Sequence, residues 1–350
     1  MYCMASVIMT NWIEYDREYR TLKRRIFESS DPLSFPHSPL LKQASGYLMV
    51  IDWDGARILA TKELPKPLGF ALRDGVLYVA TWGGEDVRGL RGNEVVSCFR
   101  HPWFNELHSV DPTPDGFLVT SSGTDLIAEL DMKGRMIWDC FLFEHGCSRS
   151  DYRLAESFKR SENYNHRHLP SNLSLHVNSA ILVDRDTVLA TVFRSNELIR
   201  IDRRTGEVEA VLRGLSRPHS IRRRAHGGYL LSNTEAGEAI LLDSELRREG
   251  TIPVPLPWIQ DTLVIGDRVL AVGGPRMPSG PTDELDTNVG KPTGILELTL
   301  DGTLVRRLDP GPDHRLYMVE PIDRKVALTL ADAWQDGGLT PTRSYRAAWG

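Results

Sequence analysis

Short apolar segments recur along the chain, each followed by a tight polar turn and a second apolar segment that ends in small residues. Alternation of apolar and polar positions is typical of β-strands, and the Asp-Gly and Gly-Gly pairs in these turns supply the positive φ angles that hairpins need. The segments lack the 3.6-residue periodicity of a helical repeat. The pattern therefore predicts six strand–turn–strand hairpins, at residues 70–82, 108–122, 178–193, 219–234, 260–274 and 317–332.

A second pair of strands follows the hairpins wherever the chain is readable, as at 126–143, 197–212, 239–254 and 295–308. One unit is thus four antiparallel strands, and it repeats after roughly 40–45 residues, which is the range of a propeller blade. The count of units predicts an all-β fold, a six-bladed β-propeller of four-stranded antiparallel blades. Five and seven blades are the alternatives.

The two ends of the chain are expected to complete one blade together. The last hairpin, 317–332, lacks its outer pair, and residues 39–64 have the pattern of the later strands of a blade. Their pairing would leave no open sheet edge. Residues 1–30 are expected to form a helical extension packed outside the propeller, and residues 31–350 a single propeller domain.

Histidines recur at equivalent positions of the innermost strands. Alignment on the hairpins superposes Pro67, His108, Asn178, His219, Gln260 and Tyr317. His176 precedes Asn178 by two residues, so both share one face of the strand. Innermost strands line the central channel, so the histidines, Asn178 and Gln260 are expected at one end of it. Asp261 and Glu320 are expected nearby.

Two long insertions are predicted on the same face. Residues 144–175 join one blade to the next, and residues 275–293 join the second and third strands of a blade. In a four-stranded meander, both kinds of connection lie where the innermost strands begin. Long loops in compact domains are usually functional or disordered. The channel mouth with the histidines is therefore the predicted working face.

Three interpretations of the histidines stay open. Neutral imidazole is the commonest metal ligand, so His108, His176 and His219 could hold a divalent metal ion, whether iron, zinc, copper, manganese or magnesium, with one position left for substrate. Asp261 or Glu320 would then be the base, with Asn178 as a further catalytic candidate. The alternatives are a metal-free site with a histidine acid, base or nucleophile, and a purely structural channel.

Composition narrows the classes of partner. The net charge is −5 and the basic residues are scattered, so the sequence lacks the footprint of a nucleic-acid-binding protein. The four cysteines form no C-x-x-C pair, which indicates free thiols in a reducing compartment. The N-terminus lacks a basic region before its short apolar run, and no apolar stretch is long enough to span a membrane. We therefore expect a cytoplasmic protein that acts on a small-molecule substrate, with neither nucleic-acid nor membrane partners.

Two repeats resemble those of known propellers. Residues 107–139 (LHSVDPTPDGFLVTSSGTDLIAELDMKGRMIWD) resemble the arylsulfotransferase-like repeat, and residues 215–243 (LSRPHSIRRRAHGGYLLSNTEAGEAILLD) are similar to the repeat shared by NHL and streptogramin-lyase propellers. The likeness is at the level of the repeat and spans about residues 39–332. The first resemblance implies a channel histidine that accepts a sulfuryl group, at His108, His176 or His219. The second implies a divalent metal beside a channel histidine, and it fits the chain's size better.

The combined expectation is a metal-dependent small-molecule enzyme of the lyase or isomerase type, acting at the channel mouth. The alternatives are an oxidoreductase or oxygenase with a histidine-bound redox metal, a metal-free histidine group transferase of the sulfotransferase type, and a non-catalytic propeller that binds a ligand or a protein. The sequence leaves the substrate and the oligomeric state open.

Overall fold

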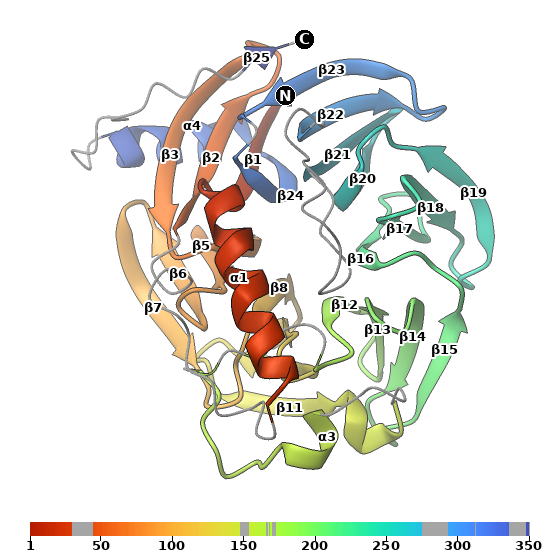
Figure 1. Ribbon diagram of the computed structural model, residues 1–350. Helices are drawn as coiled ribbons and strands as arrows, with labels where there is room; N and C mark the ends of the chain where they lie inside the picture. The colour runs from red at the N-terminus through yellow and green to blue at the C-terminus, as the bar shows by residue number, and fades with distance from the viewer. Residues whose placement is uncertain are drawn as a thin grey trace.

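The computed structural model describes residues 1–29, 45–147, 154–165, 167, 169, 173–274, 293–311, 313–335 and 348–349. In this part of the chain the strands form six antiparallel sheets, which stand around a common axis (Figure 1). Five sheets have four strands, and the sixth has four strands plus a short fifth. The prediction of an all-β propeller with six four-stranded blades is confirmed.

Blades 1 to 5 follow one another along the chain, and each runs from an innermost to an outermost strand. Blade 1 contains β4 (Pro67–Arg73), β5 (Val76–Thr81), β6 (Asp86–Arg91) and β7 (Glu94–Arg100). Blade 2 contains β8 (Leu107–Pro112), β9 (Gly116–Ser121), β10 (Leu126–Asp131) and β11 (Met136–Phe141). Blade 3 contains β12 (Val177–Leu182), β13 (Thr187–Val192), β14 (Glu197–Asp202) and β15 (Val208–Leu212).

Blade 4 contains β16 (Pro218–Arg223), β17 (Tyr229–Asn233), β18 (Glu238–Leu242) and β19 (Arg248–Pro253). Blade 5 contains β20 (Trp258–Ile265), β21 (Arg268–Gly274), β22 (Gly294–Thr299) and β23 (Leu304–Asp309), and the short β25 (Ala348–Trp349) pairs with β23. The second strands are the most buried, because both of their faces pack against neighbouring blades. They read accordingly as continuous apolar runs.

Blade 6 closes the ring with both ends of the chain. Its order is β24 (Arg315–Ile322), β1 (Tyr2–Met9), β2 (Gly46–Asp52) and β3 (Arg57–Leu64). The outer pair β2–β3 lies within the predicted segment 39–64. The expectation that residues 1–30 are wholly helical was wrong for β1, which pairs with β24 on one side and β2 on the other. All of β1 after Tyr2 is buried, because it is the second strand of its blade.

The predicted second strand of hairpin 317–332 is instead the helix α4 (Arg324–Gln335). Its buried residues are Ala327, Leu330, Ala331 and Trp334, the three-and-four spacing of a helix face. The Asp323 carboxylate accepts a hydrogen bond from the Lys325 backbone N–H at 2.7 Å, which caps the first turn. The N-terminal strand β1 takes the place in the blade that this segment was expected to fill.

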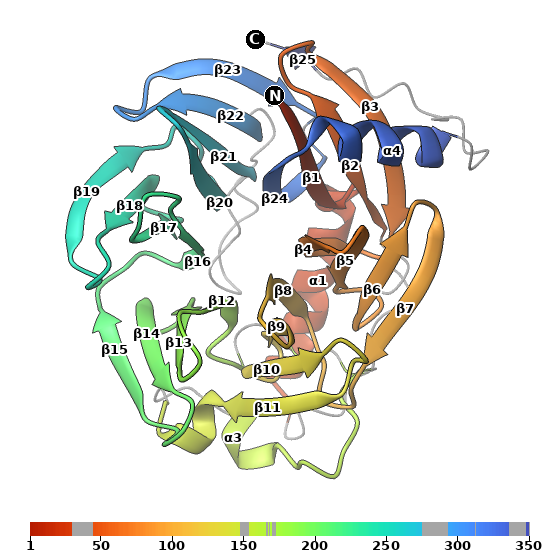
Figure 2. The same ribbon diagram turned by 180° about the vertical axis from the view of Figure 1, so that it is seen from behind.

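The helix α1 (Trp12–Phe27) lies on the opposite face from α4, as Figures 1 and 2 show from the two sides. Its buried side chains Tyr15, Tyr19, Leu22 and Ile26 share one apolar core with blades 2 and 3 and with the segment after β11. That segment includes a 3₁₀ turn, η1 (Leu142–His145), and a short helix, α3 (Leu154–Ser157). The N-terminal helix thus lies outside the ring of blades and covers the face where the innermost strands begin.

Hydroxyl groups of the second strands tie adjacent blades together near the axis. Thr120 in β9 donates a hydrogen bond to the Asn178 carbonyl at 3.0 Å, and Thr191 in β13 donates to the His219 carbonyl at 2.6 Å. These two bonds fix the innermost strands that carry the predicted site. In the described part of the chain, none of the helices is both long and apolar enough to cross a membrane.

Candidate functional site

The predicted site residues occupy β-bulges at the start of the innermost strands. In each case the residue is skipped by the pairing with the second strand, as His108 is between the paired Leu107 and Ser109. The same irregularity falls at Asn178, Gln260 and Tyr317, and the pairing of β16 is interrupted between Pro218 and Ile221, around His219. A bulge re-aims the extra side chain out of the regular ladder. The predicted register is thus reproduced at these five positions, whereas in blade 1 Pro67 is paired with Thr81 and the irregularity begins one residue later, at Leu68.

The three histidines gather at the channel mouth around an aromatic side chain. The rings of His108 and His176 lie 4.8 Å apart, edge to face. Phe193 stands between the other two, with its ring 5.4 Å from His176 and 5.1 Å from His219. The predicted convergence of imidazoles from blades 2, 3 and 4 is therefore present, with a phenyl ring inserted into it.

His108 and His219 are held in the same way. The Nδ1 atom of His108 lies 2.7 Å from the Glu106 carbonyl oxygen, and Nδ1 of His219 lies 3.1 Å from the Arg217 carbonyl oxygen. A carbonyl oxygen only accepts, so Nδ1 of His108 carries the proton and donates it. Nδ1 of His219 also lies 2.8 Å from the Thr234 hydroxyl, and the Gln260 amide that donates to Nε2 indicates the same tautomer for this ring. The second nitrogen, Nε2, then keeps its lone pair.

Both rings are neutral at pH 7. Burial lowers the pKa of His108 to about 4, and the nearby Arg315 guanidinium adds to the shift. Burial likewise holds the pKa of His219 well below its usual range, and the positive charges of Arg315 and Arg217 act in the same direction. The cause is desolvation, since a buried imidazolium loses its hydration. Both Nε2 atoms are therefore available as acceptors over the physiological pH range.

Gln260 connects His219 to a buried cation. In the orientation that satisfies both ends of its amide, the nitrogen donates to His219 Nε2 at 3.2 Å and the oxygen accepts from Arg315 at 2.9 Å. Arg315 is 9% exposed and starts β24. No such contact reaches His108, and the described residues offer its Nε2 no hydrogen-bond partner. The two equivalent imidazoles thus differ in what their Nε2 atoms can accept.

Aromatic side chains and α1 cover the histidines. The ring of Trp82 lies 6.3 Å from that of His108, and Tyr15 of α1 meets Trp82 edge to face at 5.9 Å. On the other side, the Trp258 ring lies 5.5 Å from that of His219. All three histidines are at most 8% exposed. This cover strengthens electrostatic interactions in the site because it keeps bulk water out.

A ring of further residues surrounds the mouth, two positions before each bulge. Its members are Lys66, Glu106, His176, Arg217, Trp258 and Arg315. The first four have positive φ angles of 47°, 53°, 63° and 56°, a conformation that turns the chain sharply into the strand. The sequence prediction applied this two-residue spacing only to His176 and so missed the charged members Lys66, Glu106, Arg217 and Arg315. The same spacing, extended to every blade, is the signal that finds them.

Lys66 is the most buried cation of this ring. Its ammonium group lies 4.7 Å from the centre of the Trp82 ring and 5.2 Å from that of Tyr15. Burial lowers the pKa of Lys66 to about 8, against the opposing influence of Glu85 and Glu106. Burial also raises the pKa of Glu85 well above its usual range, so this carboxyl group near Lys66 holds its proton more tightly. The site favours groups that carry or develop negative charge.

The predicted metal centre has no preassembled ligand set. Among the residues that the structure describes, no group of three or more His, Cys, Asp or Glu side chains is arranged to hold a metal ion. Phe193 occupies the space between His176 and His219, which is one physical reason. The predicted ligands therefore do not fit a three-ligand site in this arrangement.

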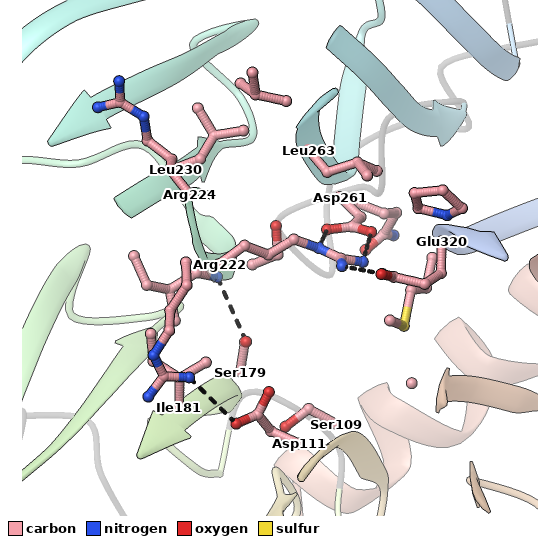
Figure 3. A pocket seen from close by; sticks show the side chains of 18 of the residues that line it. Ser109, Asp111, Ser179, Ile181, Arg222, Arg224, Leu230, Asp261, Leu263 and Glu320 are labelled. Carbon is pink, nitrogen blue, oxygen red and sulfur yellow. Dashed lines mark hydrogen bonds and ion pairs between the residues drawn. The ribbon is translucent and has the colours of Figure 1, made fainter. Parts of the chain in front are cut away.

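Asp261 and Glu320 do not lie with the histidines, and their expected placement is corrected. Both line a cavity farther along the innermost strands, which we call the channel pocket (Figure 3). Arg222 donates to both oxygens of Asp261 at 2.8 and 2.5 Å and also pairs with Glu320. Carboxylates committed to a guanidinium are poorly suited to act as a base.

Asn178 is fully buried, and its amide nitrogen donates to the Pro218 carbonyl at 3.2 Å. Its Oδ1 is a buried acceptor without a hydrogen-bond partner in the described part of the chain. The insertion 144–175 is described in part, and it packs against blade 2. Asn105 donates there to the Tyr164 and Arg167 carbonyls at 2.7 and 2.8 Å. The insertion 275–293 lies outside the described residues except for Thr293.

No protein-family model and no curated protein matches the sequence. Similar solved structures include a protein of unknown function from Bacteroides caccae, 15% identical, with a TM-score of 0.55 over 79% of this chain and 95% of that one. A chain of a nidogen–laminin complex is 10% identical, with a TM-score of 0.55 over 91% and 97% of the two chains. A streptogramin B lyase is 12% identical, with a TM-score of 0.51 over 84% and 96%.

These similarities concern the fold, since the identities are far too low to carry a function. They include propellers of the kind that the repeats resemble, the streptogramin lyases among them. The chain is a six-bladed β-propeller, with its histidines at the mouth of the channel.

Proposed function

We propose that the protein is a small-molecule enzyme of the lyase or isomerase type, with His108 as the general base at the channel mouth. The observation that carries the proposal is the contact of His108 Nδ1 with the Glu106 carbonyl at 2.7 Å. It leaves the lone pair on Nε2, which has no hydrogen-bond partner among the described residues. His219, whose Nε2 accepts from Gln260, has the supporting role of holding that amide toward Arg315.

The charge distribution matches proton abstraction from carbon. The base takes a proton from the carbon next to a carbonyl or carboxylate group, and the electron pair moves onto the oxygen. Arg315 is a buried cation close enough to lower the pKa of both His108 and His219, so it stabilises that developing charge. The protonated base then returns the proton to a neighbouring carbon in an isomerisation, or the electron pair expels a leaving group in an elimination.

The low pKa of His108 belongs to the site without substrate. Burial without a partner destabilises the imidazolium, and an anion formed beside it supplies that partner. The basicity of Nε2 therefore rises as the reaction proceeds, while the resting imidazole stays unprotonated and ready. Trp82 and Tyr15 exclude water from this step.

A hydrogen-exchange screen tests the proposal. The protein is incubated in D2O with a panel of small ketones, keto acids and hydroxy acids, and loss of carbon-bound proton signals is followed by NMR. The wild type should exchange one panel member, and His108→Gln should slow that exchange at least 100-fold. The matched control is His226→Gln, an exposed histidine in the turn after β16.

Binding of panel members without exchange would instead support the non-catalytic alternative. Equal exchange in wild type and His108→Gln would remove His108 from the base role.

Metal dependence remains a prediction with one supporting feature. Histidine ligands commonly donate Nδ1–H to a backbone carbonyl and bind the metal through Nε2, which is the arrangement of His108 and His219. A bound ion would polarise a substrate carbonyl. The described residues offer no three-ligand group, so the steps above use only the protein's own side chains.

A further inference from the structure

The channel pocket is a second cavity, which extends along the channel from beside the histidines toward the ends of the innermost strands. Its volume is about 530 Å³, a size that holds a small organic molecule. The lining comes from all six innermost strands and from the turns after some of them, and its charged groups lie beyond the bulges that carry His108 and His219. Three carboxylates and three guanidinium groups line the channel pocket: Asp111, Asp261, Glu320, Arg222, Arg223 and Arg224.

Four of these charges are committed to protein partners. Arg222 reaches across the cavity to Asp261 and Glu320, as Figure 3 shows. Arg224 pairs with Glu249 on the outermost strand of blade 4. These contacts hold the guanidinium and carboxylate groups in place and use their hydrogen-bonding capacity. These four side chains therefore form a fixed polar wall of the channel pocket, and two charged groups, Asp111 and Arg223, are not held in this way.

Asp111 and Arg223 are the remaining pair, and each lacks a hydrogen bond that its chemistry requires. Arg223 Nη1 lies 3.9 Å from Asp111 Oδ2, which is beyond hydrogen-bond distance. Asp111 Oδ2 is buried and has no hydrogen-bond partner in the part of the chain that the structure describes. Arg223 is likewise without a hydrogen bond to any described residue, and its side chain is 45% exposed.

We propose that the channel pocket binds a free amino acid with an apolar side chain. The ligand ammonium would donate to Asp111 Oδ2, and the ligand carboxylate would accept from Arg223. An α-amino acid carries both groups on one carbon, so a single ligand can satisfy two protein groups that lie 3.9 Å apart. Ile181, Leu263 and Ile265 line the same cavity and supply an apolar wall for the side chain.

The charges facing Asp111 give this ligand a distinct pH signature. Arg222 and Arg223 face it from β16, Glu320 from β24, and the Leu182 backbone from β12. Burial outweighs the two arginines and raises the pKa of Asp111 to about 6. An ammonium group binds the ionised carboxylate, so binding at pH 6 should release a proton, and affinity should fall below pH 6. A ligand with only a carboxylate would show the reverse, because it favours protonated Asp111.

Isothermal titration calorimetry of the full-length protein with three probes tests the proposal. L-Phenylalanine has both charged groups, 3-phenylpropanoate lacks the ammonium, and 2-phenylethylamine lacks the carboxylate. We expect L-phenylalanine to bind at least tenfold more tightly than either fragment. Asp111→Asn should reduce its affinity to that of 3-phenylpropanoate, and Arg223→Gln to that of 2-phenylethylamine.

Three controls isolate the channel pocket. Asp115→Asn and Arg204→Gln change the same residue types at exposed turns and should leave affinity unchanged. His108→Gln should also leave it unchanged, so this site and the proposed enzymatic site can fail independently.

Equal affinity for L-phenylalanine and 3-phenylpropanoate would overturn the amino-acid assignment, as would absence of binding by all three probes at 10 mM. Proton release at pH 6, measured in two buffers of different ionisation enthalpy, uses only the wild type. It remains decisive if a variant fails to fold by circular dichroism.

Discussion

Removal of the Tyr15 side chain should open the channel mouth without unfolding the propeller. The ring of Tyr15 stacks on that of Tyr19 at 6.1 Å and meets Trp82 edge to face at 5.9 Å. The ammonium of Lys66 lies 5.2 Å from its centre. The residue is 2% exposed, so Tyr15→Ala removes one of the few side chains that hold α1 on the face of the ring.

The expected loss is about 3 kcal/mol of docking free energy, at the lower end of the range for truncating a buried aromatic side chain, because α1 can settle partly into the space. About 1.4 kcal/mol corresponds to a tenfold change, so the open population should rise on the order of 100-fold. The blades keep their own cores, and the free energy of unfolding of the propeller should change much less.

Hydrogen exchange followed by mass spectrometry measures this directly. Peptides from α1 should exchange about 100-fold faster in Tyr15→Ala, whereas peptides from the second strands should be unchanged. Acrylamide should quench tryptophan fluorescence more strongly, since Trp82 loses its cover. Glu14→Ala, an exposed position on the same helix, is the matched control. Unchanged protection of α1, or equal loss of protection in the blades, would refute the idea that Tyr15 holds a separable cover.

Three further results are expected. The pKa of His108 falls from about 6.5 in the unfolded chain to about 4 in the fold, so the protein should lose stability as the pH falls through this window. In urea titrations, His108→Gln should reduce the loss of unfolding free energy between pH 7 and pH 5 by about 2 kcal/mol, and an unchanged loss would contradict burial as the cause. Arg222→Met should destabilise the fold by about 3–5 kcal/mol, because it leaves Asp261 and Glu320 without their cation, and Arg204→Met is the near-neutral control. A change below about 1 kcal/mol for Arg222→Met would show that these ion pairs are solvated. If the predicted metal binds, elemental analysis after dialysis should find metal in the wild type and less in a His108→Gln, His219→Gln double variant. Metal-free wild-type protein would contradict the prediction of a metal site.

The blades were predictable from sequence because their strands repeat one pattern, whereas the ends of the chain were not. The segment at residues 2–9 has no turn or partner strand beside it that would reveal a role in a sheet. Its partners, β24 and β2, come from the far end of the chain and from beyond α1. Residues 326–330 read VALTL, a short apolar run that resembles a strand. Only the burial of Ala327, Leu330 and Trp334 distinguishes the helix.

The sequence predicts which residues of the innermost strands are equivalent, but not how far along the channel each side chain lies. Equivalent positions placed His108 and His219 correctly, because each blade repeats the same bulge. Asp261 is adjacent to Gln260 in sequence, yet its side chain points into the channel pocket, where it pairs with Arg222. Neighbouring residues of a strand face opposite ways, so proximity in sequence did not mean proximity in the site. Arg315 was not predicted as a site residue, because no sequence motif surrounds it.

The pairing of β24 with β1 also sets the order in which the molecule can become competent during synthesis. The four main strands of each of blades 1 to 5 follow one another in the chain and can pair as they leave the ribosome. The strand β1 can pair with β2 early, but its other edge is paired only once β24, the last innermost strand, has been made. Arg315 and Glu320 arrive with that strand, so neither the mouth nor the channel pocket has its full set of charges before the ring closes. A chain that stops short of residue 315 would lack a blade's inner strand and both sets of charges at once. The strand β24 therefore closes the ring and completes both sites in the same step.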